Sequence, residues 1–133
     1  MSVSSLLPVL SVIVGVLVAG VGVAGLTGRL PRNRFAGVRT AASMRDDEAF
    51  RVANRVAGLP MAVAGLIAVV AGVAAFALSG TAATVTVVLI GLAGLAVITL
   101  GAGMLGHRAA LAVPEPKRPL PAGCKGCACG GCG

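Results

Sequence analysis

Two uncharged apolar runs, joined by a short polar step, decide the fold: residues 58–78, GLPMAVAGLIAVVAGVAAFAL, and residues 83–106, ATVTVVLIGLAGLAVITLGAGMLG. Each run has the roughly 20 apolar residues that a helix needs to cross a hydrocarbon core of about 30 Å. Between them, Ser79, Gly80 and Thr81 predict a tight helical hairpin turn. A single helix across both runs would be about twice as long as a bilayer is thick. We therefore predict two antiparallel spans.

A third apolar run lies near the N-terminus, over residues 3–27, and contains no charged residue. A cleaved secretory signal peptide is the alternative, but residues 1–5 lack Lys and Arg and the run is longer than a usual signal core. Of the 133 residues, 57% are hydrophobic and 11% are charged, and the mean hydropathy is +1.00. The sequence therefore predicts an all-α membrane protein with three transmembrane helices.

The cations flank these spans. The net charge of +7 would suggest nucleic-acid binding in a soluble protein, but here we expect none. Because Lys and Arg concentrate in cytoplasmic loops, the N-terminus is predicted outside and the C-terminus in the cytoplasm. The loop of residues 28–57 and the tail of residues 108–133, which follows a membrane domain of residues 1–107, hold all eleven cations: Arg29, Arg32, Arg34, Arg39, Arg45, Arg51, Arg55, Arg108, Lys117, Arg118 and Lys125.

The second half of the basic loop reads as a short helix. Asp46 or Ser43 is the expected N-cap, and the acidic residues that follow favour the positive end of the helix dipole. Asp47 is expected to pair with Arg51 four residues on. An apolar face of Phe50, Ala53 and Ala57 opposite two arginines predicts an interfacial helix lying on the membrane surface. Gly58 and Pro60 would then bend the chain into the second span.

The same loop resembles the SdpI family of bacterial membrane proteins. The resemblance rests on Asn33, Gly37-Val38-Arg39-Thr40, Asp47-Glu48, Phe50 and Asn54-Arg55. It implies a multi-pass protein of the bacterial plasma membrane, with a role in immunity against a membrane-active toxin or in signalling to a repressor at the membrane. A toxin peptide or a partner protein is then the expected ligand of the candidate residues Arg32, Asn33, Gly37, Arg39, Thr40 and Asn54.

The chemistry of these residues fits such a ligand. Arg39 offers a planar fork to a carboxylate or phosphate, Thr40 and Asn33 add hydrogen bonds, and Gly37 permits a tight turn. The alternative is that the arginines of the loop only hold it against anionic headgroups of membrane lipids.

The tail after the third span holds Pro114, Pro116, Pro119 and Pro121, which predict an extended, disordered segment. It ends in a C-x2-C-x-C-x2-C run of Cys124, Cys127, Cys129 and Cys132, whose four thiolates suit a Zn or Cu ion. A membrane-anchored metal-binding protein is therefore the alternative function. Surface thiols or lipidation sites are the other interpretation of these cysteines.

We expect no enzyme and no required cofactor, because no charged residue lies within a span and the single histidine, His107, is expected at the membrane interface. Small residues spaced by four, which favour close helix packing or a homo-oligomer, occur in two sets. These are Gly20, Ala24 and Gly28 in the first helix and Ala64, Ala68 and Gly72 in the second.

Overall fold

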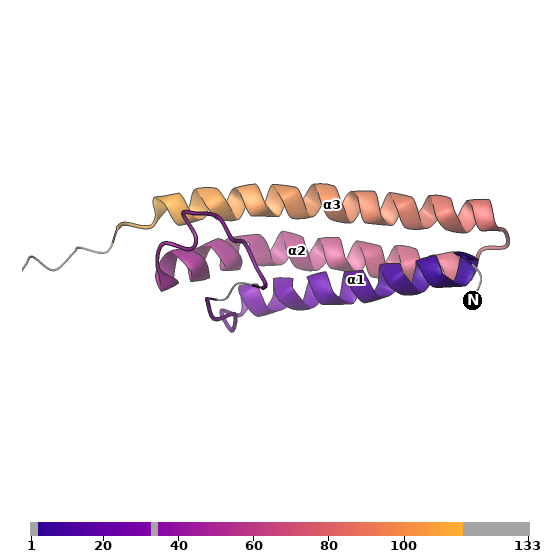
Figure 1. Cartoon of the computed structure of the whole chain (residues 1–133), viewed down its shortest axis with the longest axis horizontal. Helices are drawn as coiled ribbons and strands as arrows, with labels where there is room; N and C mark the ends of the chain where they lie inside the picture. Colours follow the sequence, from indigo (N-terminus) through magenta and orange to yellow (C-terminus); the bar gives the residue numbers. More distant parts are fainter. Residues whose placement is uncertain (1–2, 33–34, 116–133) are drawn as a thin grey trace, which may run out of the picture.

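The chain forms three long helices, α1 (Val3–Leu26), α2 (Asp47–Phe76) and α3 (Thr81–Ala112), in a computed structural model that describes residues 3–32 and 35–115 (Figure 1). Each helix is long and apolar enough to cross a membrane. The described residues contain no strand. The prediction of an all-α architecture with three spans is thereby confirmed. The cysteine-rich end of the tail lies outside the described residues.

Two glycines end α1 and open α3. Gly28, with a φ of 69°, follows α1, and the amides of Gly28 and Arg29 donate to the carbonyls of Gly25 and Ala24 at 3.1 and 3.0 Å. This paired arrangement is the usual left-handed helix stop. Gly80, with a φ of 116°, precedes α3 and accepts a hydrogen bond from Thr84 Oγ1 at 3.1 Å. The predicted hairpin turn is therefore present between α2 and α3.

Helix α2 lies between α1 and α3 and packs along both of them (Figure 1). Glycines bring the α1 and α2 backbones together. A Cβ on Gly15 would lie 2.6 Å from the carbonyl oxygen of Gly65, and one on Gly22 would lie 2.8 Å from that of Gly58. Ser11 Oγ, which is buried, donates to the Ala68 carbonyl at 2.9 Å across the same contact. Backbones this close leave no space for larger side chains.

We call this contact the glycine seam; with Gly72, which faces Pro8 and Val12, it comprises Gly15, Gly22, Gly58, Gly65 and Gly72. Its spacing within each helix is seven residues. The predicted α2 set of Ala64, Ala68 and Gly72 is buried inside the single chain, so it is not a face for a second copy. Of the predicted α1 set, Gly20 has open space beside it.

The expected interfacial helix requires a correction. Residues 47–57 are not a separate helix ending in a bend, because α2 runs without interruption from Asp47 through Pro60 to Phe76. Phe50, Ala53 and Ala57 do share a face, but it is buried in the protein. Ala53 and Ala57 pack with Val38 of the loop and with Ala102 and Ala110 of α3. The loop and α3 cover this face, so residues 47–57 are part of the helical bundle and continue the axis of α2.

The polar residues gather at one end of the bundle, which we call the basic end: the loop, the start of α2 and the end of α3. The turn between α2 and α3 lies at the other end, together with the start of α1 (Figure 1). Helix α3 continues to Ala112, past residue 107, where the membrane domain was expected to end.

We predict that the basic end faces the cytoplasm, because it carries the arginines and the opposite turn has none. A phosphatase that is active only outside the cytoplasm, inserted at Ser79, should be active. A fluorescent protein that matures only in the cytoplasm, fused after Gly133, should be bright. The reverse pair of signals would show that the orientation is inverted.

Candidate functional site

The buried side-chain amide of Asn54 joins the basic loop to α2. Its Oδ1 accepts the Val38 N–H at 2.7 Å, and its Nδ2 donates to the Phe50 carbonyl at 2.8 Å. Only 3% of Asn54 is exposed, so these bonds replace the water that the amide would have in the unfolded chain. An unpaired amide at such a place would be costly. Asn54 therefore holds the backbone of the Gly37-Val38-Arg39-Thr40 segment, which we call the signature segment.

Gly37 is the residue that lets the loop approach this amide. Its φ of 94° is in the left-handed region, and a Cβ there would overlap Asn54 Oδ1. The tight turn expected at Gly37 is present, and glycine is required for both reasons. The next side chain, Val38, is buried and faces Gly106 of α3, where a Cβ would lie 3.1 Å from a Val38 methyl group.

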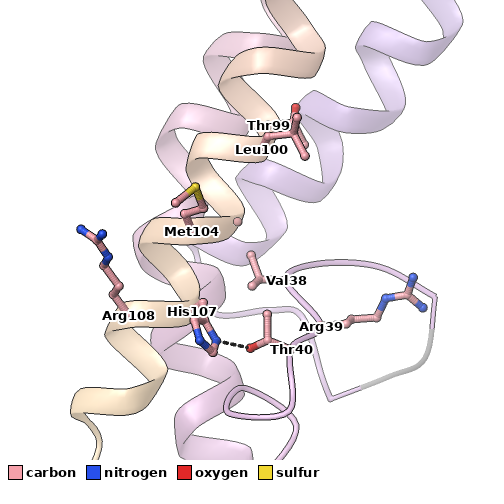
Figure 2. Close-up of a pocket in the computed structure, with 9 residues that line it drawn as sticks. Val38, Arg39, Thr40, Thr99, Leu100, Met104, His107 and Arg108 are labelled. Carbon is pink, nitrogen blue, oxygen red and sulfur yellow. Dashed lines mark hydrogen bonds between the residues drawn. The ribbon is translucent and has the colours of Figure 1, made fainter.

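A second set of hydrogen bonds fixes Thr40. The fully buried Ser43 Oγ accepts the Thr40 N–H at 2.8 Å and donates to the Val38 carbonyl at 2.9 Å. The Ser43 N–H donates to Thr40 Oγ1 at 3.2 Å. His107 Nδ1 lies 3.0 Å from Thr40 Oγ1, which is hydrogen-bond distance (Figure 2). The signature segment is thus attached to α2 by Asn54 and to α3 by His107.

Sequence reasoning missed the part played by Ser43 and His107. Ser43 was considered only as an N-cap, although Ser or Thr side chains two to three residues apart commonly close a turn. His107 was expected as an interfacial residue, and its partner Thr40 is 67 residues away in the chain. A lone histidine in the sequence indicates a polar contact or a functional role, but the sequence does not indicate that Thr40 is the residue it contacts.

Asp46 is the N-cap of α2, as predicted, and its Oδ1 accepts the Ala49 N–H at 2.7 Å. That hydrogen bond, followed by the one from Arg45 Nε at 3.0 Å, lowers the pKa of the Asp46 carboxyl below its ordinary value. Because the folded pKa is the lower one, the cap stabilises fully above the ordinary value and is lost as the pH falls through the lowered value.

Arg45 also reaches the end of α3. Its Nη2 donates to the Val113 carbonyl at 2.7 Å, and its Nη1 lies 3.9 Å from a carboxylate oxygen of Glu115. This guanidinium therefore connects the start of α2 with the last turn of α3. Such a role was not assigned to Arg45 from the sequence.

The candidate residue Arg32 lies at the outer side of the loop. Its Nε pairs with Asp47 Oδ1 at 2.8 Å, and its Nη1 donates to the Met44 carbonyl at 3.1 Å. Asp47 was expected to pair with Arg51, but it pairs with Arg32 instead. Since the Asp47 side chain is 84% exposed, the pair adds little to stability. Asn33, another candidate, lies outside the described residues.

A groove of about 450 Å³ lies between the signature segment and α3 (Figure 2). The exposed side chain of Arg39 lies on one side of it and Arg108 on the other. Its lining is polar at the basic end and, apart from Thr99, apolar farther along α3. The lining residues are Val38, Arg39, Thr40, Thr99, Leu100, Gly103, Met104, His107 and Arg108. Of the six candidate residues, Arg39 and Thr40 line the groove. Gly37 and Asn54 do not line it, but they hold the backbone of the segment that does.

The groove offers binding groups for an anion. In the part of the chain that the structure describes, no group of three or more His, Cys, Asp or Glu side chains is arranged to hold a metal ion. The four candidate metal ligands, Cys124, Cys127, Cys129 and Cys132, lie outside that part. The arrangement supplies the His107 imidazole at the basic end of the groove, with one arginine side chain on each side of it.

We predict that Gly37→Ala and Asn54→Ala each lower the free energy of unfolding by about 1–3 kcal/mol, the first through backbone strain and the second through an unpaired buried Val38 N–H. Because Gly37 and Asn54 are in contact, the double variant should lose less than the sum. Gly101→Ala, where a Cβ meets open space, is the matched control and should not lower stability. Denaturant unfolding in detergent, followed by helical circular dichroism, measures these differences. Strict additivity would show that the two residues act separately.

Comparison with known proteins places this site in a family. A family model described as the SdpI/YfhL protein family matches residues 29–102, which is more than half of the chain and includes the signature segment, Asn54 and most of α3. Neither the curated proteins nor the solved structures contain a match to this chain. On the extent of the family match, the chain belongs to the SdpI/YfhL protein family.

Proposed function

We propose that this protein acts in the bacterial plasma membrane as an immunity or signalling protein, and that it recognises a toxin peptide or a partner protein through Arg39 at its basic end. The observation that carries the proposal is the position of Arg39 between two anchored neighbours. Val38 is held by Asn54 and buried, and Thr40 is held by Ser43 and His107. The backbone that carries this exposed guanidinium is therefore fixed before a ligand binds.

Preorganisation matters here because a guanidinium binds a carboxylate or phosphate through two parallel hydrogen bonds. A flexible loop would have to lose conformational freedom on binding, which reduces the affinity. The five other described arginines of the loop and the start of α2 lie outside the groove lining: Arg29, Arg32, Arg45, Arg51 and Arg55. The family membership supports a membrane function, and the fixed backbone supports Arg39 as the residue that meets the partner.

We expect Arg39→Lys to lose activity, because an ammonium group keeps the charge but not the two-point geometry. Arg29→Lys is the matched control and should retain activity. The assay compares the survival of cells that express each variant at equal membrane abundance when they grow beside a strain that secretes a membrane-active peptide. Retention of a repressor at the membrane is the second readout. Equal activity of the two variants in both assays would remove Arg39 from the site.

The cysteine tail supports a second candidate function, metal binding by a membrane-anchored protein. Four thiolates within one short segment can close a tetrahedral shell around Zn²⁺ or Cu⁺. Replacing all four with Ser separates the two functions in the same cells. If the loop is the functional part, this variant keeps survival and repressor retention. Loss of both with Arg39 intact would favour the tail.

A further inference from the structure

The groove beside α3 combines two kinds of lining along its length. Leu100 and Met104 lie on the side toward the middle of the bundle, and His107 and Arg108 follow one turn later (Figure 2). Gly103 lines the groove next to Met104. From Leu100 to Arg108 the helix rises about 12 Å. Arg39 and Thr40 of the signature segment line the same end as His107. The groove therefore changes from apolar to cationic in the direction in which a bilayer leaflet changes from acyl chains to headgroups.

We propose that this groove binds one anionic phospholipid, with its phosphate beside His107, between the flanking Arg39 and Arg108, and one acyl chain along Leu100, Gly103 and Met104. Charge complementarity argues for this occupant, because two arginines line the groove and no residue that lines it is acidic. The side chains of Leu100 and Met104 are largely exposed in the single chain, so a lipid acyl chain could cover them. The proposal does not rest on the proposed function.

Gly103 gives the groove its depth. A Cβ on Gly103 would meet nothing within 4 Å, so a larger side chain there fills the groove without displacing the protein. Gly101 has the same open surroundings but does not line the groove. These two glycines, two residues apart on one helix, form a matched pair. Leucine adds the same side chain at either position, but only at Gly103 does that side chain occupy the space proposed for the acyl chain.

The experiment measures lipid retained by the full-length protein in native mass spectrometry, with equimolar phosphatidylglycerol and phosphatidylcholine of the same acyl chains. Wild type and Gly101→Leu should keep one phosphatidylglycerol with about a tenfold preference, whereas Gly103→Leu should keep neither lipid at this site. Arg39→Gln and Arg108→Gln should each weaken retention about fivefold, the effect of one arginine near a headgroup. Arg51→Gln, a charge at the same end but outside the groove, is the control for Arg39 and Arg108. Circular dichroism and elution volume verify that every variant is folded.

Three results would overturn the proposal. Equal retention of the two lipids would show that the cations do not select an anion. Displacement by glycerol 3-phosphate at the same concentration as the lipid would show a site for a free phosphate group, without the acyl chain. Wild-type lipid retention by Gly103→Leu, together with loss of protection in cells, would identify a peptide as the occupant. If Gly103→Leu loses the lipid but still protects cells, the lipid site is supported and is independent of the proposed function.

Discussion

The arrangement of the basic end depends on one buried amide. Asn54 is on the second turn of α2, and it uses its oxygen for the Val38 N–H and its nitrogen for the Phe50 carbonyl. The bond to Phe50 lies within α2, whereas the bond from Val38 forms only when the loop packs against α2. At this depth water does not take the place of the Val38 N–H. From that contact the chain brings Thr40 to His107, and so attaches the loop to α3. Arg39 lies between the two attachments.

The glycine seam continues along α2 from Asn54, because Gly58 follows Asn54 by four residues and lies on the same face of the helix. Because α1 and α2 approach through Gly15, Gly22, Gly58 and Gly65, the remaining faces of α2 are available for the loop and for α3. Gly25 of α1 also allows the two helices to approach closely, since a Cβ there would lie 2.7 Å from the carbonyl oxygen of Asn54. Helix packing in the membrane part and loop structure at its end are thus connected through the same few turns of α2.

Local signals in the sequence predicted the spans, the turn at Gly80, the cap at Asp46 and the tight turn at Gly37, because each depends on hydropathy or on residues close together in the chain. Contacts between distant residues could not be predicted in the same way. Asp47 had Arg51 within one helical turn, yet it pairs with Arg32, which the folded loop brings near. The face of Phe50 and Ala53 was recognised as apolar, but its pattern does not say whether lipid or protein covers it. Small residues spaced by four were expected to favour close helix packing, whereas the glycines of the seam are spaced by seven.

Asn54 holds the signature segment in one fixed structure. The most direct measurement is the hydrogen exchange rate of the Val38 amide, followed by NMR on the full-length protein in detergent. We predict that Val38 in wild type exchanges many times more slowly than the same amide in an unstructured peptide, and that in Asn54→Ala it exchanges at nearly the rate of that peptide. Rapid exchange of Val38 in the wild-type protein would contradict the account, because the loop would then be seated without the bond on which it is said to depend.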